Sequence, residues 1–255
     1  PGGERRGQCE ERDGHARAGD RHGDEVVLGV PLRNELQRKT AQDGAKHQSL
    51  FYFEAARGAS PIAALGERHV ILFVSSGAGA VEVSGRRFAV VENAGVYVRP
   101  NEAFRLHNDG DAPLKVFAAA CPQVAEVAWV DAMPANFDAA CPERVVALDP
   151  AQRVSMGDRF FQLLVDKRIG STVVTQFIGD IPLSKAAPHR HLYEESLIVL
   201  AGGGCMWTEG RKAQVRTGDV IFLPRKQIHS LQCTDPKGMM LVGMIYPGDN
   251  PSINY

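Results

Sequence analysis

The sequence repeats one pattern of strands and turns, and this repeat restricts the possible folds more than any other feature. The stretch from Gly77 to His107 can be laid over the stretch from Gly202 to Ser230. Each copy has a Gly-x-Gly opening, a strand-like run, a turn that contains glycine, and a second run that ends at proline. Pro100 follows Gly77 by 23 positions and Pro224 follows Gly202 by 22, so one insertion aligns the copies. This is the pattern of a duplicated β unit.

The runs between the turns have the composition of β-strands. Examples are "HVILFVSS", "STVVTQFIG" and "DVIFLP", in which β-branched and aromatic residues dominate. Gly, Pro, Asn and Asp separate such runs at intervals of roughly 8–12 residues, which is typical of a sandwich or a barrel. Sustained helical periodicity is absent. The sequence therefore predicts an all-β protein with two tandem barrels.

The chain divides into four parts. Residues 1–25 contain 12 charged residues and six glycines but no Val, Ile, Leu, Met or aromatic residue, so we expect a mobile polar tail. The repeat places one barrel at 26–122 and the other at 151–255. The Ala- and Pro-rich segment 123–150 between them is interpreted as a connector that wraps the outside.

Composition excludes several classes of protein. With 255 residues and 44% hydrophobic side chains, the chain can bury one large core or two small ones. A net charge of -1 gives no general attraction to nucleic acid or to an anionic membrane. No apolar run approaches the roughly 20 residues of a membrane span, and the N-terminus lacks a signal-peptide core. Five scattered cysteines without a Cys-x-x-Cys pair favour reduced thiols and a cytoplasmic location.

Ionisable residues gather at the start of one apolar run in the second copy, "PHRHLYEESLIVLAGGG". His189 and His191 are two apart, so on a strand both side chains point to one face. Glu195 begins the apolar run and shares its inward face with alternate residues, which leaves Glu194 pointing outward. His229 follows five residues after Pro224. The alternative without a functional role is an exposed hairpin on which these side chains are solvated charges. The strands around them are apolar, however, and ionisable groups that point into an apolar interior need an ion pair or a metal to be tolerated.

The spacing of these residues resembles the two motifs of the cupin superfamily. The motifs are His-x-His, three residues, Glu, six residues and Gly, and then Gly, five residues, Pro, four residues and His. The resemblance covers nearly the whole second half. It implies a small jelly-roll barrel that holds one divalent metal through His189, His191, Glu195 and His229. Two departures occur at positions that are not ligands in the family: Lys226 replaces a usual glycine, and Cys233 replaces a frequent asparagine.

Three imidazoles and a carboxylate form a donor set that suits Fe(II), Mn(II), Ni(II), Zn(II) or Cu(II), and they leave positions open for substrate and water. Around them, Glu195 is also a candidate proton acceptor. Tyr193 is a candidate hydrogen-bond donor to substrate, or else packs at the rim. Arg225 and Lys226 are candidates for binding an anionic substrate, or else are solvated turn residues.

The first copy lacks such a donor set. Aligning the repeats on Gly77 and Gly202, and on Pro100 and Pro224, places four residues at the ligand positions, namely Ala64, Gly66, Val70 and Arg105. We therefore expect the first barrel to be structural, with binding of a small molecule left open.

Three classes of function remain. The resemblance favours a metal-dependent dioxygenase that acts on a small, anionic or enolisable organic substrate. The alternatives are a non-oxygenase enzyme (isomerase, lyase or aminohydrolase), in which the metal acts as a Lewis acid, and a non-catalytic binding or sensor protein. No nucleic-acid or membrane partner is expected. A homodimer is expected, because proteins commonly bury exposed strand edges against a second copy.

Overall fold

The computed structural model describes residues 32–33, 45–253 and 255, and these residues form β-strands and loops. The described residues contain no α-helix, and they contain two short 3-10 turns, η1 (Pro150–Gln152) before the first strand of the second barrel and η2 (Lys167–Ile169) within that barrel. The predicted all-β class is confirmed. The predicted tail, residues 1–25, lies outside the described residues. In the described part of the chain, no helix is long and apolar enough to cross a membrane.

The first barrel consists of two antiparallel sheets, A and B. Sheet A has the order β1 (Leu32–Arg33), β2 (Ser49–Ala55), β10 (Leu114–Cys121), β5 (His69–Ser76), β8 (Ala94–Val98) and β12 (Val145–Ala147). Sheet B has the order β11 (Ala128–Val130), β4 (Ile62–Ala64), β9 (Ala103–Asn108), β6 (Gly79–Val83) and β7 (Arg86–Val90), and β3 (Gly58–Ala59) also pairs with β9.

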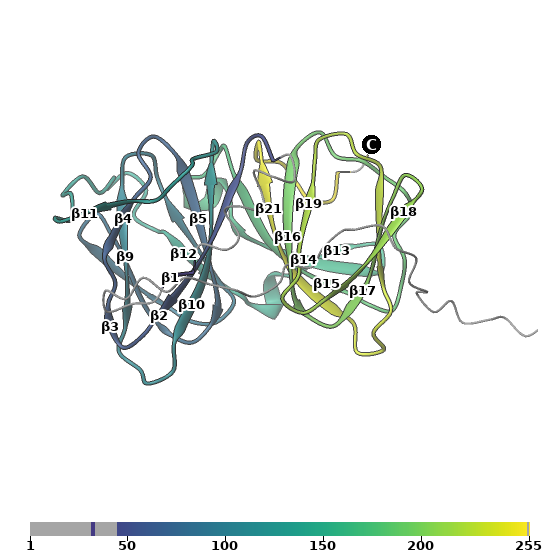
Figure 1. Cartoon of the computed structure of the whole chain (residues 1–255), viewed down its shortest axis with the longest axis horizontal. Helices are drawn as coiled ribbons and strands as arrows, with labels where there is room; N and C mark the ends of the chain where they lie inside the picture. Colours follow the sequence, from purple (N-terminus) through teal and green to yellow (C-terminus); the bar gives the residue numbers. More distant parts are fainter. Residues whose placement is uncertain (1–31, 34–44, 254) are drawn as a thin grey trace, which may run out of the picture.

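The second barrel consists of sheets C and D. Sheet C has the order β13 (Val154–Met156), β14 (Arg159–Val165), β15 (Thr175–Ile181), β21 (Met239–Tyr246), β16 (Glu194–Ala201) and β19 (Val220–Leu223). Sheet D has the order β18 (Arg211–Arg216), β17 (Gly203–Thr208) and β20 (His229–Cys233). Figure 1 shows the two barrels side by side, the first in purple and teal and the second in green and yellow.

Sheets A and C pack against each other between the barrels. Each barrel has its own apolar core, and a third cluster, the shared core, joins the outer faces of the two sheets. The shared core includes Phe73 and Tyr97 from sheet A, and Leu164, Ile198 and Met244 from sheet C. Strands β5 and β16 therefore bury both faces, which explains why "HVILFVSS" and "ESLIVLA" read as continuous apolar runs without polar alternation.

The expected connector, residues 123–150, contributes strands to the first barrel. Its strand β11 pairs with β4, and its strand β12 pairs with β8 at the edge of sheet A. Both strands are three residues long. Strands this short show no period-2 pattern, so composition alone indicated only a linking segment. The sheets of the first barrel thus extend to residue 147.

Close packing between sheets A and C predicts a sensitive position in β8. A Cβ added at Gly95 would lie 2.3 Å from Gln176 Oε1 and 2.7 Å from Leu164 Cβ, both across the shared core. We expect Gly95→Ala to lower the free energy of unfolding by about 1–3 kcal/mol, the usual cost of overpacking. Urea unfolding of the purified variant measures this.

Gly110→Ala is the matched control, because a Cβ there meets only Asn108 Oδ1 at 3.5 Å, an ordinary contact. Equal stabilities of the two variants would contradict tight packing of β8 on sheet C.

Candidate metal centre

Backbone pairing brings the three histidines of the second barrel together. His229 is the first residue of β20, and His189 lies opposite it in an isolated antiparallel bridge. The His189 amide donates to the His229 carbonyl at 3.0 Å, and the His229 amide donates to the His189 carbonyl at 2.9 Å. His191 lies two residues further along the loop that leads into β16. A regular strand was expected for the His-x-His pair, whereas the structure has a loop that is held by isolated bridges, this one and Lys185 with Gln232.

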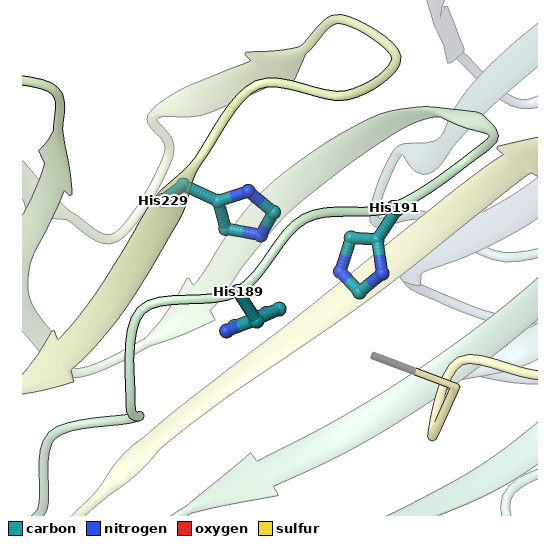
Figure 2. A group of neighbouring side chains, drawn as sticks. All are labelled: His189, His191 and His229. Carbon is teal, nitrogen blue, oxygen red and sulfur yellow. The ribbon is translucent and has the colours of Figure 1, made fainter. Parts of the chain in front are cut away.

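The imidazole rings surround one small space. One ring nitrogen of each of His189, His191 and His229 lies within 4.8 Å of the others. Their ring centroids are 4.4–4.9 Å apart. Figure 2 shows the three rings turned toward one another, two from the loop and one from β20. Two nitrogens bound to one ion at about 2.1 Å can be at most about 4.2 Å apart, so a small inward movement suffices for shared coordination.

Backbone carbonyls select the same tautomer in all three histidines. The Nδ1 atoms of His189, His191 and His229 lie 2.8, 3.2 and 3.0 Å from the carbonyl oxygens of Ala187, Ile253 and Gln227. A carbonyl only accepts, so each Nδ1 must hold the proton. Each Nε2 is then left with a free lone pair. This is the arrangement in which a second partner fixes the tautomer and orientation of a metal-binding histidine.

Burial keeps the imidazoles of His191 and His229 neutral. It lowers the pKa of His191 to about 4, with further lowering by the neighbouring His229 and His189. It also lowers the pKa of His229 to about 4. At neutral pH neither ring has to lose a proton before it can bind a cation.

Glu195 lies beside the histidines inside the barrel. Its Oε2 is 3.7 Å from His191 Nε2, although the carboxylate falls outside the compact group of three nitrogens. Burial raises the pKa of Glu195 to about 8. Glu194 points the other way, and its carboxylate accepts from the backbone amides of Lys46 and His47 at 3.1 Å each. Both glutamates are buried, so the alternative of two solvated charges on a hairpin does not hold.

Tyr193 packs directly on the histidine cluster. Its ring stacks on His191, with centroids 4.5 Å apart and an 11° angle between the planes. The side chain is buried, and its Oη has no hydrogen-bond partner among the described residues. Burial, together with the nearby Glu195, Asp249 and Tyr255, raises the pKa of the phenol. The hydroxyl therefore keeps its proton and can donate it in a hydrogen bond.

Arg225 and Lys226 are exposed on the turn before β20. Lys226 has a φ of 67°, the left-handed conformation that explains why glycine is usual there. Its amide donates to the His191 carbonyl at 2.7 Å, so the turn still supports the cluster. Asn101 has the same φ at the corresponding turn of the first barrel.

The first barrel has apolar side chains at the positions that correspond to the four donors. Three of these four residues differ from the ones that the sequence alignment predicted. In the second barrel Thr208 pairs with His229, and in the first its counterpart Val83 pairs with Phe104, not Arg105. Phe104 in turn pairs with Ala63, as His229 pairs with His189. The residues at the four positions are therefore Ala63, Leu65, Val70 and Phe104, and all four belong to the first apolar core.

The one-residue shift has a simple cause. The pairing follows an ungapped alignment from Gly77 through β9, so Pro100 and Pro224 are not equivalent, and the loop before β5 is one residue longer than the loop before β16. The Val70 position was predicted correctly, because Val70 pairs with Val98 as Glu195 pairs with Leu223.

A buried ion pair in the first barrel was not predicted. Arg144 Nη1 and Nη2 donate to Glu102 at 2.5 and 2.9 Å, and Arg144 also lies over the Phe137 ring. Phe137 packs against the first core. The sequence gives little indication of this ion pair, because a single Arg in a loop segment is ordinarily exposed to solvent.

The comparisons with known proteins agree with this geometry. The cupin domain model matches residues 181–245, which include the three histidines and Glu195. No curated protein matches the chain.

Solved structures of two kinds share the fold. A salicylate 1,2-dioxygenase from Pseudaminobacter salicylatoxidans aligns with a TM-score of 0.63 and 12% identity, over 79% of this chain and 71% of that one. Procruciferin, an 11S globulin from Brassica napus, aligns with a TM-score of 0.67 and 9% identity, over 86% and 81%. The coconut allergen cocosin aligns with a TM-score of 0.69 and 9% identity, over 88% and 83%. At these identities the likeness shows the fold alone. The second half of the chain thus contains a match to the cupin domain, and the chain as a whole shares its two-barrel fold with these solved structures.

Proposed function

We propose that the second barrel holds one divalent transition metal through His189, His191, His229 and Glu195. The observation that supports this most directly is the shared tautomer of the three histidines, which leaves three Nε2 lone pairs facing one space. The raised pKa of Glu195 supplies a second reason, because a buried carboxyl without a strong partner is stabilised by a cation. Nitrogen and oxygen donors of this kind suit Fe, Mn, Ni, Zn or Cu.

We infer further that the centre is catalytic, with dioxygenase chemistry on a small organic substrate as the favoured activity. Four donors leave positions open on metals that commonly take five or six ligands. When bound, such a metal supplies Lewis acidity and a site for substrate and oxygen. A solved structure with this fold is a salicylate 1,2-dioxygenase in an adduct with gentisate, whereas the globulins show that the fold alone does not decide activity. A non-oxygenase enzyme and a binding protein are the alternatives.

Two side chains of the chain itself have roles in this proposal. Tyr193 Oη is a buried, protonated and unpartnered donor among the described residues, next to His191, and is suited to a hydrogen bond with an anionic substrate oxygen. Glu195 is suited to accept a proton, since the pKa of its carboxyl lies near neutrality in the absence of a metal. Substrate binding by Arg225 and Lys226 stays a prediction.

Metal content tests the ligand set. We expect elemental analysis to find about one divalent ion per chain, and His191→Ala to bring the content near zero, because a site with three nitrogen donors loses most of its affinity when one is removed.

His107→Ala is the control, since His107 lies in the other barrel, where its ring pairs with Glu82. Two ions per chain, or an unchanged content in His191→Ala, would show that the metal is bound elsewhere.

Glu195→Gln separates catalysis from folding. The pKa of folded Glu195, about 8, lies above its ordinary value of 4.5, so the folded state holds the extra proton and the stability of the metal-free protein falls as pH rises from 4.5 through 8. Gln does not titrate. Stripped of metal, the variant should therefore match the wild type near pH 5 and exceed its stability near pH 9 in urea unfolding. With metal, it should consume no oxygen on a panel of phenols and small enolisable acids.

Wild-type protein under the same conditions is the reference. If the difference in stability between Glu195→Gln and the wild type does not grow with pH, the raised pKa of Glu195 is contradicted. A metal-loaded wild type that consumes no oxygen with any member of the panel would contradict the dioxygenase and favour the alternatives.

A homodimer is proposed from the exposed edge of sheet C. Strand β13 is the edge strand, and Val154 on it and Phe160 on the adjacent β14 expose 50% and 43% of their surfaces, so this edge offers apolar surface to a second copy. Light scattering at micromolar concentration should give the mass of two chains. A mass of one chain would contradict the proposal.

A further inference from the structure

We infer that the C-terminal segment, residues 249–253 and 255, is part of the metal centre, because it positions His191. We call this segment the C-terminal strap. The inference rests on the proposed function, in which His191 binds a metal. The family match ends at residue 245, so the strap lies outside the part of the chain that resembles a cupin domain.

His191 differs from the other two histidines in the origin of its hydrogen-bond acceptor. His189 Nδ1 and His229 Nδ1 bond to the carbonyls of Ala187 and Gln227, each two residues earlier in the same loop. His191 Nδ1 bonds to the carbonyl of Ile253, 62 residues away. The orientation of this one ring therefore depends on a distant piece of chain.

Backbone hydrogen bonds hold the strap beside the loop that carries the histidines. The Arg190 amide donates to the Tyr255 carbonyl at 3.3 Å, and the Tyr255 amide donates to the Arg190 carbonyl at 3.1 Å. This pair of bonds lies directly next to His191 in sequence. The carboxyl end of the chain lies at the upper rim of the second barrel (Figure 1).

The strap has its own fixed shape. The Ile253 amide donates to the Asn250 carbonyl at 3.1 Å, and Asn250 Oδ1 accepts from the Ser252 amide at 3.0 Å. Pro251 is buried, and the Gly248 amide donates to the Val173 carbonyl at 2.6 Å just before the strap begins. These hydrogen bonds hold the strap in place, and with it the Ile253 carbonyl that accepts from His191 Nδ1.

Loss of such an outer partner has a measurable effect. Partners that orient a metal-binding histidine typically contribute 10- to 100-fold in metal affinity. Without the Ile253 carbonyl, His191 can exchange tautomers or rotate its Nε2 away from the cluster. The strap is a positioning element, and its side chains do not have to touch the metal.

Tyr255→Pro and Tyr255→Ala form a matched pair that tests the strap. Both remove the tyrosine side chain, but only proline lacks the backbone N–H that bonds to the Arg190 carbonyl. We expect Tyr255→Pro to weaken binding of Zn²⁺ or Mn²⁺ about 10-fold in competition with a chromophoric chelator. Tyr255→Ala should bind like the wild type. Equal affinities of the two variants would overturn the inference.

A second readout uses the metal-free protein. Nitrogen NMR should show a hydrogen-bonded Nδ1–H on His191 in the wild type and in Tyr255→Ala, and its loss in Tyr255→Pro, while His189 and His229 stay unchanged. A His191 signal that persists in Tyr255→Pro would contradict the positioning role even if affinity changes.

Deletion of residues 251–255 is the variant to use if Tyr255→Pro does not fold, and it should have the same two effects, because it removes the Ile253 carbonyl itself. Retention of wild-type affinity and of the His191 signal in this variant would also overturn the inference. Absence of metal binding in the wild type would instead count against the proposed function, and the NMR comparison would still decide whether the strap orients His191.

Discussion

Strand β16 is the element on which both the fold and the site depend, because it is buried on both faces. On its outer face, Glu194 accepts two backbone amides from residues 46 and 47, and Ile198 joins the core shared by the two barrels. On its inner face, Glu195 lies beside the histidines. A strand enclosed in this way cannot slip by one residue without exchanging its two glutamates and its whole apolar set. The packing of the first barrel on sheet C therefore also fixes which carboxyl faces the histidines.

The four corresponding positions inside the two barrels are occupied in opposite ways, by polar donors in one barrel and by apolar side chains in the other. In the second barrel, three imidazoles and a carboxyl are tolerated because a backbone carbonyl bonds to every Nδ1 and because one nitrogen of each ring faces the same space. In the first barrel, Ala63, Leu65, Val70 and Phe104 fill the same positions with apolar surface. A mixture would leave a buried polar group without a partner, which is the costly case. This cost explains why all four positions in the first barrel are apolar.

Sequence reasoning reached the all-β class and the meeting of His189, His191 and His229, because strand-like composition, regularly spaced turn residues and fixed motif spacing are local signals. It also separated Glu195 from Glu194 correctly by face. It missed the register at Phe104, since prolines are weaker alignment points than paired strands, and it missed Arg144, whose partner Glu102 lies 42 residues earlier. The acceptor for His191 was equally out of reach, because Ile253 contributes a backbone carbonyl and no side-chain pattern records it.

Strand β12 has a consequence for how the chain acquires its shape. It completes the edge of sheet A, yet it follows the first repeat and ends three residues before η1 begins at Pro150. Domains generally fold as units, the N-terminal one first during synthesis, so the first barrel gains its last strand only after β12 has been synthesised. From that point no free linker separates the barrels. The second repeat follows β12 along the chain, and its sheet C packs on sheet A through the shared core.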